Sequence, residues 1–238
     1  MSDATKSTSS SLGIGSSFAV SVLRLGAGRA VGPLGPRPQK RLELFEFEAC
    51  PFCRKVREAL TVLDLEAVIY PCPKQGERFR PGVIERGGKA QFPYLVDANA
   101  GVELYESDAI VAHLFERYGS SPAPLWLRVA GLNDLGSILA GLPRAARGGW
   151  VRPSRRPEVP LELWSFEVSP YCRLVRERLC ELEIPYVLHN VASGSPSRAS
   201  FPEAAGRVQV PYLRDPNTGR EMLESGDIVA YLDAEYGQ

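Results

Sequence analysis

The chain is organised around an internal repeat. Three separated segments of its first half recur, in the same order, in its second half. Recurrence of this kind predicts two copies of one domain, because each copy must then build its own set of strands and helices. The matched segments are residues 50–57 with 169–176, residues 91–95 with 209–213, and residues 106–112 with 224–230.

The first copy predicts the element order β-α-β-α-β-β-α. Residues 42–47 alternate between apolar and polar side chains, which is typical of a strand. Pro51 occupies the first position of a helical pattern, where proline is favoured. Ser107 is a suitable N-cap for the closing helix, and Gly119 lies just beyond its end. The predicted strands are residues 42–47, 67–70, 94–97 and 102–105, and the predicted helices are 51–64, 79–86 and 107–118.

The second copy predicts the same order. Its strands are expected at residues 161–166, 186–190, 212–215 and 222–224, and its helices at 170–182, 197–205 and 225–236. The domain boundaries follow from this assignment. The predicted units are an N-terminal tail with a short helix at 1–40, a first domain at 41–119, a basic linker with a short helix at 120–160, and a second domain at 161–238.

The two segments outside the copies are rich in arginine or serine. The linker is basic enough to contact phosphates or anionic lipid, but a solvated linker with one packing helix explains its composition equally simply. Residues 1–11 are rich in Ser and Thr and poor in acids, which suits either a tail or the start of a transit peptide. Residues 17–25 have a partial counterpart at 133–141, which favours the tail.

Composition excludes several classes of protein. Net charge is zero, so no general attraction to nucleic acid is expected. No run reaches the roughly 18 apolar residues of a membrane span. Five cysteines in 238 residues are too few for a disulfide scaffold, which indicates a reducing compartment such as the cytoplasm, or an organelle if the N-terminus is a transit peptide.

Cys50 and Cys53 form the pattern that carries the chemistry. They lie at a predicted strand-to-helix turn, where helix amides and the macrodipole lower a thiol pKa from about 8.5. Cys50 is therefore the candidate nucleophile and Cys53 the resolving thiol. The alternatives are an inert structural pair or half of a zinc site. Zinc would need two more ligands, and no pair at ligand spacing exists among Cys72, Cys172, Cys180, His113 and His189, so no metal site is predicted.

These residues resemble a known family. Strand, Cys-Pro-Phe-Cys, helix, then Phe92-Pro93-Tyr94 before a hairpin and Glu106-Ser107 before the last helix, resembles the glutaredoxins. It is still more similar to the N-terminal, thioredoxin-fold domain of the glutathione transferases. The first copy also resembles the glutaredoxin-like domain of membrane-associated prostaglandin E synthase 2. The resemblance covers both copies and omits residues 1–40 and about 120–160.

The resemblance implies an α/β protein with two tandem thioredoxin-fold domains. The all-helical second domain of the transferases, which holds the electrophile, has no counterpart in the sequence. Glutathione is the implied ligand and cofactor. The backbone before a cis-proline would pair with its cysteinyl part, and an acidic-Ser pair at a helix N-terminus would bind its γ-glutamyl group. The matching residues are Phe92, Pro93, Glu106 and Ser107 in the first copy, and Val210, Pro211, Glu224 and Ser225 in the second.

The second copy departs at the decisive position, because Ser169 replaces the first cysteine. Dithiol exchange is therefore impossible there. By resemblance to some glutathione transferases, Ser169 would stabilise the glutathione thiolate through its hydroxyl. A serine is also an ordinary N-cap, so the second copy either binds glutathione or simply packs.

Three functions fit the sequence. The first is a glutathione-linked thiol-disulfide oxidoreductase that uses Cys50 and Cys53, with glutathionylated or disulfide-bonded proteins as partners. The second is a glutathione transferase or isomerase that uses Ser169. The third is a non-catalytic binding or redox-sensing module. By analogy with some glutaredoxins, an iron–sulfur cluster held by Cys50 and glutathione across a dimer is a further alternative.

Overall fold

The structure is a computed structural model that describes residues 28–128, 147–202 and 206–238. The predicted tail at 1–11, the short helix at 17–25 and its counterpart at 133–141 lie outside the described residues. None of the helices in the described ranges is long and apolar enough to span a membrane.

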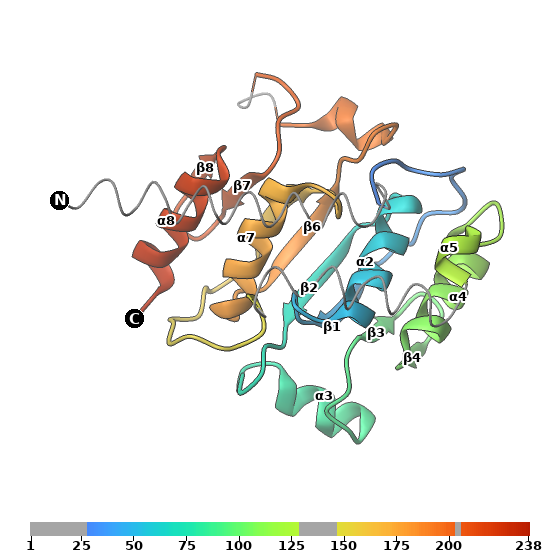
Figure 1. Cartoon of the computed structure of the whole chain (residues 1–238), viewed down its shortest axis with the longest axis horizontal. Helices are drawn as coiled ribbons and strands as arrows, with labels where there is room; N and C mark the ends of the chain where they lie inside the picture. The colour runs from blue at the N-terminus through green and yellow to red at the C-terminus, as the bar shows by residue number, and fades with distance from the viewer. Residues whose placement is uncertain (1–27, 129–146, 203–205) are drawn as a thin grey trace.

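The two copies build one mixed sheet of eight strands, in the order β4-β3-β1-β2-β6-β5-β7-β8 (Figure 1). Within each copy the first two strands are parallel and a hairpin adds two antiparallel strands. The predicted α/β thioredoxin-type order is thus confirmed in both halves. The strands are β1 (Leu42–Glu46), β2 (Ala67–Pro71), β3 (Tyr94–Asp97), β4 (Val102–Leu104), β5 (Leu161–Ser165), β6 (Tyr186–Asn190), β7 (Tyr212–Asp215) and β8 (Arg220–Met222).

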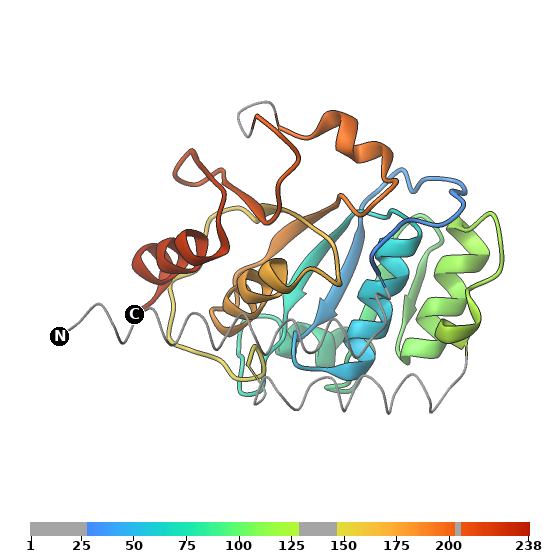
Figure 2. The same ribbon diagram turned by 45° about the horizontal axis from the view of Figure 1, so that its top comes forward.

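Four twelve-residue helices cover one face of this sheet (Figure 2). They are α2 (Pro51–Val62), α4 (Ser107–Tyr118), α7 (Pro170–Glu181) and α8 (Ser225–Tyr236). The hydrophobic core beneath them is continuous across both copies, and contains Leu44 and Leu60 together with Leu163 and Leu179. Phe45 belongs to a separate cluster with Val83 of α3 (Arg80–Gly87), as the alternation of a strand requires.

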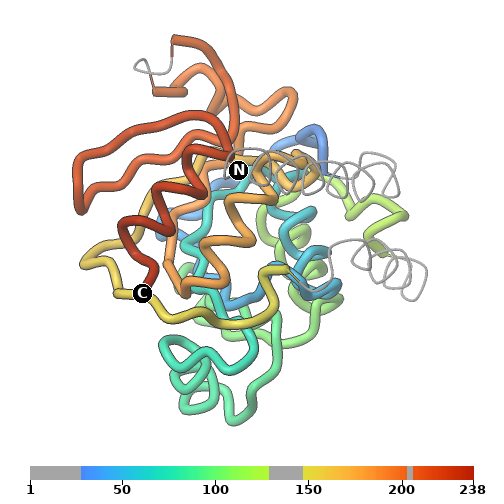
Figure 3. The backbone as a smooth tube through the Cα atoms, turned by 60° about the vertical axis from the view of Figure 1, so that its left-hand side comes forward, coloured from blue at the N-terminus to red at the C-terminus, as the bar shows by residue number. Residues whose placement is uncertain are grey.

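The two halves meet where β2 pairs with β6. Ala67 lies opposite Leu188 and Ile69 opposite Tyr186, in an antiparallel register. Because two equivalent strands pair antiparallel, the halves are related by an approximate two-fold axis. The helices that follow β1 and β5, α2 and α7, therefore lie side by side and run in opposite directions (Figures 1 and 3).

The equivalence extends to the segment that precedes each first strand. Residues 28–35 and 148–154, which we call the straps, each bridge the loop after the second strand of the other copy. The bridges are Ala30 with Ser193 and Lys74 with Trp150. Each strap then hydrogen-bonds the last turn of its own first helix, at Val62 O or Glu181 O. Helix α5 (Leu125–Arg128) is the described helix of the linker.

Two predicted elements of the second copy differ from the structure. The helix expected at 197–205 is a 3₁₀ helix at Pro196–Ser200, because Ser195 and Pro196 start a turn that ends at Phe201. Residues 203–205 lie outside the described part. Strand β8 begins at Arg220 rather than at residue 222. The turn before it reaches a left-handed φ of 71° at Gly219, which sets Arg220 opposite Asp215.

Candidate active site

Cys50 is the N-cap of α2. Its Sγ accepts a hydrogen bond from the backbone amide of Cys53 at 3.3 Å, and both thiols are buried. The hydrogen bonds that reach Cys50 from Cys53 lower the pKa of its thiol, although burial opposes them. Burial, together with the hydrogen bond to Cys50, raises the pKa of Cys53 well above its ordinary value. The two thiols are therefore chemically distinct, with the more readily ionised one at the helix end.

Ser169 caps α7 with the same geometry. Its Oγ accepts from the backbone amide of Cys172 at 3.3 Å, and Cys172 is fully buried. A hydroxyl thus replaces a thiol without a change in the local backbone. Because α2 and α7 run in opposite directions, their N-termini lie at opposite ends of this helix pair (Figure 1). Cys50 and Ser169 accordingly do not share one site.

The bonds before Pro93 and Pro211 are both cis. In the first copy, Phe47 packs edge-on against Phe92 with ring centroids 6.3 Å apart, and the amide of Cys50 donates to Phe47 O at 3.0 Å. The turn that carries the thiol therefore lies beside the residue that precedes the cis-proline.

Arg80 is a residue that the sequence did not single out. Its guanidinium lies 4.6 Å from the centre of the Phe92 ring, and its Nε donates to Cys72 O at 3.1 Å. In the second copy, Arg198 donates to Val191 O at 3.1 Å in the equivalent loop. In the first copy, a cation thus lies beside the residue that precedes the cis-proline, where it suits an anionic end of a ligand. An alignment of the loops after β2 and β6 would have indicated Arg80 from the sequence, because it matches Arg80 with Arg198.

Glu106 and Glu224 are the N-caps of α4 and α8, with left-handed φ angles of 66° and 65°. A residue with a side chain pays of order 1–3 kcal/mol for such a conformation, which clusters at functional sites. The prediction that Ser107 is the N-cap is wrong, because Ser107 is the first residue of α4 and no side-chain hydrogen bond caps that helix. Ser225 begins α8 in the same way, and both serines are buried. The predicted acidic-Ser pair thus sits at a helix N-terminus in each copy.

The same contact in both copies joins this pair to the cis-proline loop. The Gln91 side-chain amide donates to Glu106 Oε1, and Gln209 donates to Glu224 Oε1 in the same way. The residues predicted to bind glutathione are therefore brought together in each copy. Both glutamines recur in the sequence within the matched segments, so their recurrence was the signal for this link.

A family model described as glutathione S-transferase, N-terminal domain, matches residues 44–122 and again residues 163–238, more than half of the chain. The chain belongs to this family. Bombyx mori glutathione transferase BmGSTD1 is 26% identical over 39% of this chain and 44% of its own, with a TM-score of 0.33. The chain therefore spans less than half the length of that structure.

Two further solved structures are similar in part. The complex of BmGSTD1 with GTT is 19% identical over 48% of this chain and 69% of its own, with a TM-score of 0.33. Leishmania TDR1, described as a unique trimeric glutathione transferase, is 12% identical over 84% of this chain and 68% of its own, with a TM-score of 0.29. No curated protein matches the chain.

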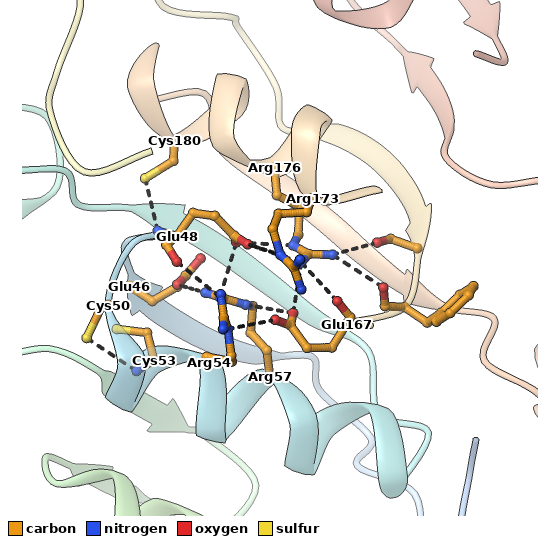
Figure 4. A network of polar contacts seen from close by, with 12 residues as sticks. Glu46, Glu48, Cys50, Cys53, Arg54, Arg57, Glu167, Arg173, Arg176 and Cys180 are labelled. Atoms are coloured by element: carbon orange, nitrogen blue, oxygen red, sulfur yellow. Dashed lines mark hydrogen bonds and ion pairs between the residues drawn. The ribbon is translucent and has the colours of Figure 1, made fainter. Parts of the chain in front are cut away.

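A buried network of charges lies beside the dithiol, between α2 and α7 (Figure 4). Arg176 donates to both carboxylate oxygens of Glu48, each at 3.1 Å, and pairs with Glu167 at 3.0 Å. Arg57 pairs with Glu167 at 2.9 Å and with Glu46. The arginines of each copy thus bind carboxylates of the other. Their recurrence was visible in the sequence, but arginines are usually exposed, so burial was not expected.

Glu46 breaks the symmetry of this network. Ser165 occupies the equivalent position and accepts from Arg176 Nη1 at 3.2 Å. Burial raises the pKa of Glu46 to about 7, against the attraction of Arg57. For Glu167, the attraction of Arg176 and Arg57 outweighs burial and lowers the pKa to about 2. The negative charge of Glu46 also reaches Cys50 and Cys53, and raises the pKa of each thiol.

The remaining cysteines do not extend the site. Burial raises the pKa of Cys72 and of Cys180, and the Sγ of Cys180 accepts from the amide of Glu48 at 3.4 Å. Across the ranges that the structure describes, no three His, Cys, Asp or Glu side chains are grouped as a metal site would require.

Proposed function

We propose that the chain is a glutathione-linked thiol-disulfide oxidoreductase that acts through Cys50 and Cys53. The observation that carries this proposal is the placement of two thiols at one helix N-terminus, where the amide of Cys53 donates to Cys50 Sγ at 3.3 Å. Hydrogen bonding lowers the pKa of Cys50, whereas burial raises that of Cys53. Membership of the glutathione S-transferase N-terminal domain family supports glutathione as the ligand. As part of the same proposal, we take the first copy to be similar to the glutaredoxin-like domain of prostaglandin E synthase 2.

The reaction begins with the Cys50 thiolate. It attacks the glutathione sulfur of a mixed disulfide, a Cys50–glutathione disulfide forms, and the substrate thiolate leaves and takes up a proton. A second glutathione thiolate then attacks the glutathione sulfur on Cys50, which releases glutathione disulfide and restores the Cys50 thiolate. For a protein disulfide, the Cys50 thiolate first attacks one substrate sulfur, which breaks the substrate disulfide and forms a Cys50–substrate mixed disulfide. Cys53 then loses its proton and attacks the Cys50 sulfur, so that a Cys50–Cys53 disulfide forms and the substrate leaves with both of its thiols reduced.

The remaining site residues hold glutathione in this proposal. The backbone of Phe92 pairs with its cysteinyl part and Glu106 faces its ammonium. The hydroxyl of Ser107 and the first amides of α4 donate to its γ-glutamyl carboxylate. The guanidinium of Arg80 suits its second carboxylate. Glutathionylated proteins in a reducing compartment such as the cytoplasm are the substrates.

The second copy supports another candidate activity. Ser169 keeps the cap geometry of Cys50, and Val210, cis-Pro211 and Glu224-Ser225 repeat the rest of the site. A hydroxyl at this position can donate to a glutathione thiolate, which is the activation step of a transferase. The second copy is accordingly a glutathione-binding site without redox chemistry.

The test is glutathione-dependent reduction of a small mixed disulfide. Cys50→Ser should abolish turnover, and Ser169→Ala should leave it unchanged. The pKa of Cys50, measured by pH-dependent alkylation, should lie below about 8.5, the value of a free thiol. Loss of conjugation to a model electrophile in Ser169→Ala alone would favour the transferase. No turnover in either assay, with a spectral shift on oxidation, would favour a sensing module.

A further inference from the structure

Lys55 is a fully buried lysine beside the dithiol. It lies on α2, and its Nζ pairs with Asp108 Oδ1, although the Asp108 side chain is 56% exposed. Removing an ammonium from water is costly unless a partner offsets the loss of hydration. An ion pair whose carboxylate is half exposed offsets little of that free energy. Stability alone is therefore a weak reason for this pair.

The position of the pair is more informative. Cys50 caps the N-terminus of α2, and Asp108 directly follows Ser107 at the N-terminus of α4. The pair therefore joins the two helices whose ends carry the candidate nucleophile and the candidate γ-glutamyl site. A bound glutathione would contact both ends at once, its sulfur at Cys50 and its γ-glutamyl group at Ser107.

The second copy provides an internal control. Leu174 replaces Lys55, and Gly226 follows Ser225 where Asp108 follows Ser107. Helix α7 nevertheless packs on α8 as α2 packs on α4. Contact between the helices thus does not require the pair. The pair occurs in the copy that has the thiol and is missing from the copy that has Ser169.

We infer that Lys55 and Asp108 are a positioning pair that holds the N-terminus of α4 at a fixed place relative to Cys50, so that glutathione bound at Ser107 presents its sulfur to the thiolate. This inference rests on the proposed function. Misplacement of reacting atoms by about 1 Å can cost on the order of 100-fold in rate, so a fixed spacing between two anchors has catalytic value. The second copy, which performs no sulfur exchange, has no need of it.

The experiment is a double-mutant cycle with Lys55→Leu and Asp108→Asn. Each single variant should raise the KM for glutathione about tenfold. The KM of the double variant should be no higher than that of the more impaired single variant, because the two side chains act as a unit. Lys55→Arg should restore most of the affinity. The matched control is Asp227→Asn, which removes the first-turn acid of α8 and should leave KM unchanged.

Two readouts separate positioning from stability. The rate of Cys50 alkylation by iodoacetamide should stay at the wild-type value in Asp108→Asn. In the double variant, which leaves no ammonium buried without its partner, the midpoint of thermal unfolding should stay close to that of the wild type while the KM for glutathione stays raised. An unchanged KM in both single variants, or additive effects in the double variant, overturns the inference while wild-type turnover upholds the proposed function. If the wild-type protein neither turns over nor binds glutathione by calorimetry, both fail.

Discussion

Single residues distinguish the two copies more than their folds do. Cys50 and Ser169 cap their helices identically, and the exchange of sulfur for oxygen alone decides whether thiolate chemistry is available. Glu46 follows the same division, since Ser165 replaces it in the copy without the dithiol. The charge beneath the dithiol is therefore a property of the first copy.

Glu46→Gln should lower the pKa of Cys50. The carboxylate raises the pKa of this thiol, and it is ionised mainly above pH 7, because its own pKa is about 7. The rate of Cys50 alkylation should thus rise in the variant above pH 7 and match the wild type below it. Ser165→Ala, the change at the equivalent position, should have no effect. A higher pKa in Glu46→Gln would mean that the carboxylate supports the thiolate.

The hairpin and the closing helix are joined by a buried aspartate in each copy. Asp97 accepts from Tyr118 at 2.7 Å and contacts His113 Nε2 at 2.8 Å. Asp215 is held in the same way by two tyrosines, Tyr231 and Tyr236. His113 thus fills the position that Tyr231 occupies in the second copy, because both side chains reach the equivalent aspartate.

Tyr118→Phe should destabilise the protein by about 1.5–3 kcal/mol, the usual value of a hydrogen bond to a charged group. Burial raises the pKa of Asp97, but hydrogen bonds from Tyr118, His113 and Asn99 outweigh it and lower the pKa to about 2. The stabilisation is complete above the unfolded pKa near 3.8 and is lost as the pH falls towards 2. Urea titrations at pH 7 and pH 3 measure the difference. A gap between wild type and variant that is as large at pH 3 would contradict this account.

The elements were predictable because their signals are local. Pro51 and Pro170 mark helix starts, and the closing helices have Ser107 and Ser225 at their first positions. The straps were not predictable, because they bind through backbone groups such as Lys74 N to Gly149 O, which leave no residue signature. The site followed the same rule. Its cysteines, prolines and acidic-Ser pairs formed motifs, whereas Arg80 acts through a contact that only the fold creates.

The pairing that joins the two halves could not be predicted from the sequence, for a similar reason. Most residues of β2 and β6 are apolar, as is typical of inner strands of a sheet, but neither sequence indicates which strand lies next to it. From the sequence alone, the charged residues between α2 and α7 would be expected to face solvent. In the structure they are buried, because they form ion pairs with residues of the other half. The result is one sheet and one continuous core, so the halves should unfold together.

Arg176→Met tests this cooperativity, because it removes one partner of the buried network in the second half. Loss of one member of a buried ion pair costs about 3–5 kcal/mol, since the carboxylates of Glu48 and Glu167 remain buried without it. Buried cysteines report on each half separately, Cys72 on the first and Cys172 on the second. Thiol labelling along a urea titration, read by mass spectrometry, should expose both at one midpoint, and Arg176→Met should lower that midpoint for both equally. Arg214→Met, which removes part-exposed pairs with Glu162 and Glu221, should lower the free energy of unfolding by less than about 1 kcal/mol. Labelling of Cys172 before Cys72 would show instead that each half is stable alone.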